Sequence, residues 1–330
     1  MATVTGQVTV GAQVIPVTAS VTLPSAGTWL SGQSDPDTTA DGSFAAWRGR
    51  PVEIGGAWAS NLYWSWVHDC PDWSVGPGST MAGVPALDWA ITPWPTGEGS
   101  CSWAQAAAGA YDSHWSEHLD TLKIAWGSRD PAKLFLRFAW EMNGSWFPWR
   151  VQPGEQASFI TAWRRFAALA RAKLPRSPIV WCCNAGSSYA YSVASLWPGD
   201  AYVDVVGLDA YNWWPWVNSQ ATWQAKIVAT ENGGPKQLES FRLFAAARSK
   251  PMCVPEWSNV GRDTGGGGGD APVYVSLFHD WLTANAGTGS GQVVYEVLFN
   301  WAGRDEGFAF YPQADSPLTA ANYRQLWAAQ

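Results

Sequence analysis

Residues 134–150 read LFLRFAWEMNGSWFPWR, and the character of the chain changes within this stretch. Its apolar start has the length and composition of a buried parallel strand. A carboxylate, Glu141, follows directly after Trp140, and an Asn-Gly turn dipeptide marks where the strand ends. Burial beside indoles would raise the pKa of Glu141, as a general acid working near neutral pH requires. The alternative is a structural role, in which Glu141 pairs with Arg137 or caps the next turn.

On both sides of this stretch, strand-like apolar runs alternate with helical patterns. The predicted strands are residues 28–31, 51–56, 86–91, the run before Glu141, and residues 179–183, 203–208, 251–255 and 292–299. The predicted helices are residues 44–48, 111–126, 153–173, 236–248, 270–285 and 317–329. This alternation predicts an α/β fold with a parallel sheet, and eight such units predict a (β/α)8 TIM barrel over residues 28–330.

Two segments fall outside this alternation. Residues 1–27 alternate small or β-branched residues with polar ones, which predicts a β-patterned N-terminal extension. It would be either a short hairpin attached to the barrel domain or the end of a separate neighbouring domain. Residues 57–81 are rich in Trp, Gly and Pro and predict a long loop, and loops of that length usually carry function.

The composition excludes several classes of partner. Charged residues make up 14% of the 330 residues and the formal net charge is −7, which argues against disorder and against a nucleic-acid-binding surface. No apolar run is long enough to span a membrane. The 25 Trp residues suit sugar recognition, because the flat apolar face of an indole matches the C–H face of a pyranose.

The cysteines and histidines predict no metal and no cofactor, because neither a CxxC pair nor a His/Cys cluster with metal-ligand spacing is present. Cys182, Cys183 and Cys253 lie in apolar runs and are expected to be buried. Cys70 and Cys101 lie in segments with Pro, Gly and Ser residues, and they are the one pair expected to form a disulfide in an oxidising setting.

A second carboxylate, Glu256, follows the seventh predicted strand. In a barrel the carboxyl ends of all strands open at one mouth, and the fourth and seventh strands lie on opposite sides of it. Glu141 and Glu256 would then face each other, and two carboxylates that flank a sugar bond are the working groups of a glycosidase. The alternative for Glu256 is a strand-end side chain bound to the next loop.

The segment RFAWEMNGSWFPW resembles the acid/base segment of glycoside hydrolase family 26, whose best-known members are endo-β-mannanases. Further stretches line up in order from about residue 28 to the C-terminus, among them ITPWP, IVWCCNAG, VDVVGLDAYNWWPW, KPMCVPEWS and VLFNW. The resemblance implies a (β/α)8 barrel and a retaining mechanism with Glu141 as acid/base and Glu256 as nucleophile. It also implies that Tyr211 hydrogen-bonds the nucleophile and that Trp146 lines the substrate cleft.

Trp140 departs from the family pattern, which commonly has His before the acid/base residue. If Trp140 lines the cleft, a stacking surface replaces a polar contact, which predicts weak turnover of plain β-1,4-mannan and activity on another polysaccharide. Alternatively, Trp140 turns away from Glu141, as strand alternation predicts, and has no effect on substrate choice. The other side chains near strand ends expected to contact substrate are Asn143, Trp94, Trp149, Trp257, Trp301 and Arg137.

The expected function is therefore that of a retaining, endo-acting glycoside hydrolase that cleaves a β-mannan-like or bacterial cell-wall polysaccharide. A non-catalytic carbohydrate-binding or structural phage tail protein on a barrel scaffold is the alternative. No export signal is visible at the N-terminus, so the protein is expected to be extracellular as part of a larger polypeptide, or associated with a virion. The β-patterned start and the Ala-, Gly- and Trp-rich composition favour a phage tail context.

Overall fold

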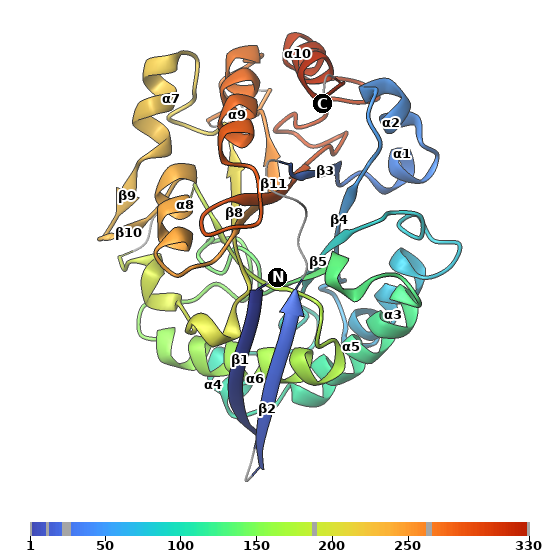
Figure 1. The fold of residues 1–330 in the computed structure, drawn as a ribbon, viewed down its shortest axis with the longest axis vertical. Coiled ribbons are helices and arrows are strands. Elements are labelled where there is room, and N and C mark those ends of the chain that lie inside the picture. The colour runs from blue at the N-terminus through green and yellow to red at the C-terminus, as the bar shows by residue number, and fades with distance from the viewer. Residues whose placement is uncertain (1, 11–12, 22–27, 187–189, 262–265, 329–330) are drawn as a thin grey trace. The chain divides into compact units, whose positions relative to one another are not determined.

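The computed structural model describes residues 2–10, 13–21, 28–186, 190–261 and 266–328. Eight strands form a closed barrel in the order β11-β12-β3-β4-β5-β6-β7-β8, with helices outside it (Figure 1). This confirms the predicted (β/α)8 barrel. The barrel strands are β3 (Leu30–Gln33), β4 (Ile54–Trp58), β5 (Leu87–Ile91), β6 (Leu134–Phe138), β7 (Ile179–Asn184), β8 (Val205–Tyr211), β11 (Met252–Ser258) and β12 (Val293–Leu298).

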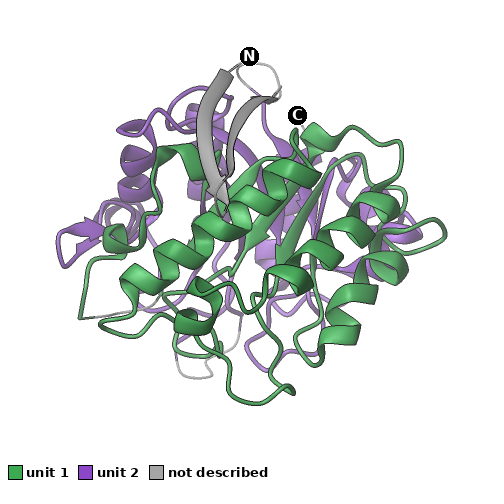
Figure 2. Cartoon of the chain, turned by 90° about the horizontal axis from the view of Figure 1, so that it is seen from below, with its two compact units in different colours: residues 1–23, 57–206 green, residues 24–56, 207–330 purple. Residues whose placement is uncertain are grey.

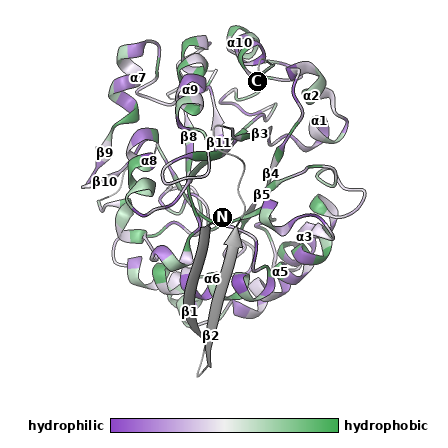
Figure 3. Cartoon of the chain, in the orientation of Figure 1, coloured by the Kyte–Doolittle hydropathy of each residue, from purple (hydrophilic) through white to green (hydrophobic). Residues whose placement is uncertain are grey.

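Most helices follow a barrel strand in the chain, as in repeated βα units. The α-helices are α1 (Pro36–Ala40), α2 (Ser43–Arg48), α3 (Trp64–Val75), α4 (Trp103–Ala107), α5 (Asp112–Trp126), α6 (Gln156–Lys173), α7 (Gln220–Ile227), α8 (Leu238–Ala246), α9 (Pro272–Asn285) and α10 (Pro317–Ala328). Short 3-10 helices are Pro131–Lys133, Val193–Leu196 and Asp200–Tyr202. The helix ribbons carry both hydrophilic and hydrophobic residues (Figure 3), as expected of helices with one face towards a core.

The chain divides into two compact units (Figure 2), unit 1 with residues 1–23 and 57–206 and unit 2 with residues 24–56 and 207–330. In unit 1, β5, β6 and β7 pair in parallel, with Leu87 opposite Leu134 and Leu136 opposite Ile179. In unit 2, β11, β12, β3 and β4 pair in parallel in that order. All residues of β5, β6, β7, β11 and β12 are buried, which explains their continuous apolar character in the sequence.

The N-terminal residues form strands, as the alternating pattern predicts. β1 (Ala2–Val10) and β2 (Gln13–Val21) pair antiparallel from Ala2 opposite Val21 to Val10 opposite Gln13. They make a two-stranded sheet that is separate from the sheet of the barrel. Whether residues 1–27 are a separate domain stays a prediction.

The predicted long loop at residues 57–81 is wrong in part, because α3 forms within it. Cys70 lies on this helix, is fully buried and directs its Sγ towards the carbonyl of Val67 at 3.2 Å. Cys70 and Cys101 are free thiols, so the predicted disulfide is also wrong. Burial raises the pKa of the Cys70 thiol to about 12, and this thiol is therefore unreactive near neutral pH. Cys182, Cys183 and Cys253 are buried as expected.

Arg137 takes part in two interactions in the interior of unit 1. Arg137 on β6 pairs with Asp88 on β5 at 2.7 Å, and both side chains are fully buried. The Arg137 guanidinium also lies 5.9 Å from the ring centroid of Trp58.

Among the described residues, no helix combines the length and the hydrophobicity that crossing a membrane requires.

Candidate active site

Glu141 lies three residues beyond the end of β6, in a tight turn that departs from ordinary backbone geometry. The φ angles of Ala139 and Glu141 are 48° and 52°, a left-handed conformation that costs a non-glycine residue about 1–2 kcal/mol. The Glu141 N–H donates to the carbonyl of Cys182 on β7 at 3.0 Å, and its own carbonyl accepts from Gly144 at 2.7 Å. The neighbouring strand therefore holds the strained turn in place.

The carboxylate of Glu141 is 5% exposed and receives two N–H donors from unit 1. Asn184 Nδ2 donates to Oε1 at 2.5 Å, and Trp146 Nε1 donates to Oε2 at 2.8 Å. These two donors hold both carboxylate oxygens of Glu141 in place. Arg137, one of the partners that the structural alternative named, pairs with Asp88.

Asn143 links the turn after β6 to the end of β7. Its Nδ2 donates to the carbonyl of Asn184 at 2.8 Å, and its Oδ1 accepts from the Asn184 N–H at 2.8 Å. The side chain is 1% exposed, and its contact with substrate stays a prediction. Its two hydrogen bonds fix the backbone of Asn184, whose amide in turn binds Glu141. Arg137 is likewise fully enclosed and part of the interior ion pair rather than a surface for substrate.

A hollow of about 510 Å³ in unit 1 contains two of the predicted aromatic residues. Trp146 is 53% exposed and borders this hollow while its N–H binds Glu141. Trp94 lies on the same hollow and is 3% exposed, because Trp103 packs against it edge to face at 4.6 Å. Trp146 is thus the indole with both an open face and a bond to the carboxylate.

Trp140 and Trp149 pack with each other and with Phe147. The ring centroids of Trp140 lie 4.7 Å from Trp149 and 5.0 Å from Phe147, and Trp140 is 5% exposed. Trp149 is fully buried, stacks on Phe147 at 4.4 Å and donates its Nε1 to the carbonyl of Trp140. Trp149 is therefore a core residue and not a substrate contact. The packing of Trp140 favours the alternative in which it has no direct effect on substrate choice.

In unit 2, Glu256 is on β11 and is 5% exposed. Alternation along the strand directs the next residue, Trp257, to the opposite face. Trp257 is fully buried against Phe278 of α9 at 4.4 Å and Trp327 of α10 at 5.4 Å. Trp257 therefore packs in the layer between strand and helices, which does not support its expected contact with substrate. Glu256 accordingly faces away from these helices.

Tyr211 is the last residue of β8 and donates its hydroxyl to Glu256 Oε2 at 2.8 Å, as predicted. Its ring lies against Phe308 at 5.1 Å and Phe299 at 5.8 Å. Trp301 is 38% exposed and stacks on the same Phe299 at 6.0 Å. Trp301 thus shares an aromatic neighbour with Tyr211 and keeps a face open, as a substrate contact requires.

Two side chains of the site were not singled out from the sequence. Asp209 on β8 is fully buried, and one of its carboxylate oxygens lies within 4.8 Å of one of Glu256. Among the described residues of unit 2, Asp209 and Glu256 have carboxylate oxygens close enough together to contribute to a site for a hard cation. Asn184 is the amide that binds Glu141. Both end predicted strands, at the sequences GLDAY and CCNAG, so their position at a strand end was the available signal.

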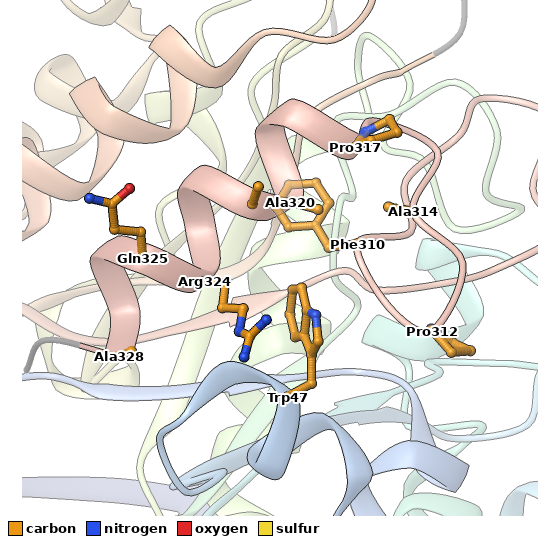
Figure 4. Close-up of a pocket in the computed structure, with 10 residues that line it drawn as sticks. Trp47, Phe310, Pro312, Ala314, Pro317, Ala320, Arg324, Gln325 and Ala328 are labelled. Atoms are coloured by element: carbon orange, nitrogen blue, oxygen red, sulfur yellow. The ribbon is translucent and has the colours of Figure 1, made fainter.

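A second hollow of about 510 Å³ lies in unit 2 along α10. Figure 4 shows Trp47 of α2 extending towards Phe310, with Ala320 and Arg324 on the neighbouring helix α10. Its described lining residues include neither Asp nor Glu and none of the predicted site residues.

Comparison with protein families matches residues 115–240 to glycosyl hydrolase family 26. This segment includes Glu141 and Tyr211, while Glu256 lies beyond it. Endoglucanase H of Acetivibrio thermocellus is 26% identical over 246 residues, which are 71% of this chain and 24% of that protein. Mannan endo-1,4-beta-mannosidase A and B of Caldalkalibacillus mannanilyticus is 30% identical over 108 residues, 30% of this chain and 20% of that protein. The chain thus spans about a quarter of the length of these relatives or less.

Solved structures of similar fold include an endo-β-1,4-mannanase double mutant of Cellulomonas fimi. It has a TM-score of 0.65 and 18% identity and aligns over 92% of this chain and 71% of the other. The catalytic domain of a family 26 endo-β-1,4-mannanase from Bacillus sp. JAMB-750 has a TM-score of 0.62 and 14% identity, over 91% and 85% of the two chains. The family match, the sequence relatives and the shared barrel lead to one conclusion: this chain is similar to glycosyl hydrolase family 26 over residues 115–240 and has the barrel fold of solved family 26 structures.

Proposed function

We propose that the protein is an endo-acting, retaining glycosidase of a β-1,4-linked, mannan-type polysaccharide, with Glu141 as acid/base and Glu256 as nucleophile. In a (β/α)8 barrel the carboxyl ends of all strands open at one mouth. In the chain, Glu141 follows β6 and Glu256 lies near the carboxyl end of β11. The observation that carries the proposal is the 2.8 Å hydrogen bond from Tyr211 to Glu256. A donor on one carboxylate oxygen leaves the other oxygen oriented for attack.

The chemistry follows the double-displacement scheme. A carboxylate oxygen of Glu256 attacks the anomeric carbon, and the glycosidic C–O bond breaks as Glu141 transfers its proton to the leaving oxygen. A glycosyl–enzyme ester results. Water then attacks the same carbon, Glu141 takes the proton of that water, and the ester bond to Glu256 breaks with release of the sugar. Each carboxylate ends the cycle in its starting state.

The substrate class rests on two lines of support. The relatives named above include enzymes described as a β-1,4-mannosidase and as endo-β-1,4-mannanases, and one described as an endoglucanase. The exposed indoles Trp146 and Trp301 supply open stacking faces. The packing of Trp140 against Trp149 and Phe147 favours the alternative in which Trp140 does not affect substrate choice, and plain mannan is therefore the first substrate to test.

The test is release of reducing ends from β-1,4-mannan, glucomannan and β-1,4-glucan by wild type, Glu141→Gln and Glu256→Gln. Each variant should lose activity by on the order of 10³-fold or more while binding the polymer. Glu117→Gln is the matched control, since that side chain is 61% exposed on α5, and it should behave as wild type. Full activity of Glu256→Gln would refute the assignment. Polymer binding by wild type without any new reducing ends would favour the non-catalytic binding protein.

A further inference from the structure

Three residues at the end of β8 and just after it have their backbone carbonyls held by side chains from outer helices. Tyr274 of α9 donates its hydroxyl to the carbonyl of Ala210 at 3.2 Å. Lys226 of α7 donates its Nζ to the carbonyl of Tyr211 at 3.3 Å and to that of Trp213 at 2.8 Å. Carbonyls that accept a hydrogen bond from a side chain are fixed relative to the helix that carries the donor. Lys226 thus supplies the partners for two of them.

The residue between these two carbonyls is also fixed. The Asn212 N–H donates to the carbonyl of Ser258 on β11 at 3.1 Å. Its side-chain Oδ1 accepts from the Val217 N–H at 2.8 Å, and its Nδ2 donates to Asn259 Oδ1 at 3.1 Å. The backbone that carries Tyr211 is therefore tied on one side to the strand of Glu256 and on the other side to Lys226.

The burial of the Lys226 ammonium is unfavourable for the stability of the fold. Among the described residues its ammonium makes no ion pair, and burial lowers its pKa to about 8. The two carbonyls therefore do not recover the full cost of removing the charge from water. An apolar side chain of similar length would avoid that cost but would remove both hydrogen bonds to these carbonyls. The lysine gives up stability for a fixed backbone at the point where Tyr211 reaches Glu256.

We propose that Lys226 is a positioning residue, whose ammonium fixes the backbone on both sides of Asn212 and so holds the Tyr211 hydroxyl on Glu256. This inference rests on the proposed function of Glu256 as nucleophile. Lys226 touches neither substrate nor the reacting atoms in this scheme. Its effect reaches the chemistry through the 2.8 Å bond between Tyr211 and Glu256.

A double-mutant cycle tests this route with Lys226→Met, Tyr211→Phe and the combined variant. Lys226→Met should lower kcat by about 10- to 100-fold with little change in KM, because small displacements of a catalytic group cost about that much. In the Tyr211→Phe background the same change should have almost no further effect, whereas independent roles would be additive. Lys226→Arg should restore most of the activity. Lys236→Met is the control, since Lys236 pairs with Glu231 at 2.8 Å, and it should leave kcat unchanged.

A crystal structure of Lys226→Met separates this inference from the proposed function. The Tyr211 hydroxyl should move out of hydrogen-bond reach of Glu256, whether or not the protein hydrolyses the chosen polymers. An unchanged contact, or additive losses in the cycle, would overturn the role of Lys226 and leave the function standing. Absence of hydrolysis by wild type, together with the displaced hydroxyl in the variant, would overturn the function and keep the positioning role.

Discussion

At the scale of single residues, Trp146 combines an exposed aromatic face with a hydrogen bond to the Glu141 carboxylate. Its indole is 53% exposed, and its N–H donates to Glu141 at 2.8 Å. A sugar stacked on this ring would therefore lie next to the acid/base group. Asn184 donates to the other carboxylate oxygen. Each of the two oxygens of Glu141 is therefore held by an N–H donor.

Replacement of Trp146 by Phe should separate these interactions, because Phe keeps an aromatic face and removes the donor. A hydrogen bond to a charged group contributes about 1.5–3 kcal/mol, so kcat/KM should fall by about 10- to 100-fold. Steady-state kinetics on a soluble polymer checks this. The control is Trp73→Phe, since Trp73 is 59% exposed on α3 and bonds to no carboxylate of the site. Equal kinetics for Trp146→Phe and wild type would show that the N–H is dispensable.

The sequence identified the two carboxylates and Tyr211 but not the surroundings of each indole. Trp146, Trp149 and Trp257 all lie near strand ends, yet only Trp146 is exposed. Exposure depends on which side chains from distant segments cover a ring, such as Phe278 and Trp327 over Trp257. Strand alternation already predicts that Trp257 and Glu256 point to opposite faces of the sheet. The sequence therefore argued against placing both side chains at one substrate site.

At the scale of elements, α3 forms despite Pro71 in its interior. Proline has no N–H, so the carbonyl of Val67, four residues earlier, loses its helical partner. His118 of α5 replaces it, with Nδ1 at 2.6 Å from that carbonyl. The Trp89 N–H on β5 donates to His118 Nε2 at 2.9 Å, which makes Nε2 the acceptor and Nδ1 the donor. Neutral His118 thus joins two helices and a strand.

This arrangement predicts a loss of stability in mild acid. Burial lowers the pKa of His118 from 6.5 to about 4, so the unfolded chain binds the proton first as the pH falls. The stability is complete above pH 6.5 and decreases between pH 6.5 and 4, by up to about 3 kcal/mol from this residue. Denaturant unfolding of wild type and His118→Gln at several pH values measures it. The variant should show a weaker pH dependence, because glutamine can make both hydrogen bonds without titrating. Parallel curves for the two proteins would contradict this.

Elements with a strong period were predictable, and α3 was not. α9 occupies Pro272–Asn285 and α5 occupies Asp112–Trp126, both within a residue or two of the predicted bounds. Proline and the Gly- and Pro-rich flanks of α3 are signals of a loop in any reading of the chain alone. The partner that makes the helix possible, His118, is about fifty residues away, which local patterns do not register.

At the scale of the whole molecule, the eight-strand barrel was predictable because each strand is a short apolar run separated from the next by a helical pattern. Chain order then assigns Glu141 to the end of one strand and Glu256 to another. The distance between the carboxyl groups depends on the barrel's tilt and on the strained turn at Glu141, which no pattern encodes. Mechanism is therefore the property of this fold that most needs measurement.

Whether hydrolysis retains the configuration of the anomeric carbon depends on the distance between the two carboxyl groups. A retaining enzyme holds its carboxyl groups about 5–5.5 Å apart, whereas an inverting one leaves about 6.5–9.5 Å for a water molecule. The first product released from a β-1,4-linked substrate should therefore be the β-anomer, as proton NMR during early hydrolysis can show. Azide adds a test of each role with an activated β-glycoside. The small anion should restore turnover of Glu141→Ala with a β-glycosyl azide product, and that of Glu256→Ala with the α-azide. An α-anomer released first by wild type would instead require inversion, with Glu256 activating water rather than attacking the sugar.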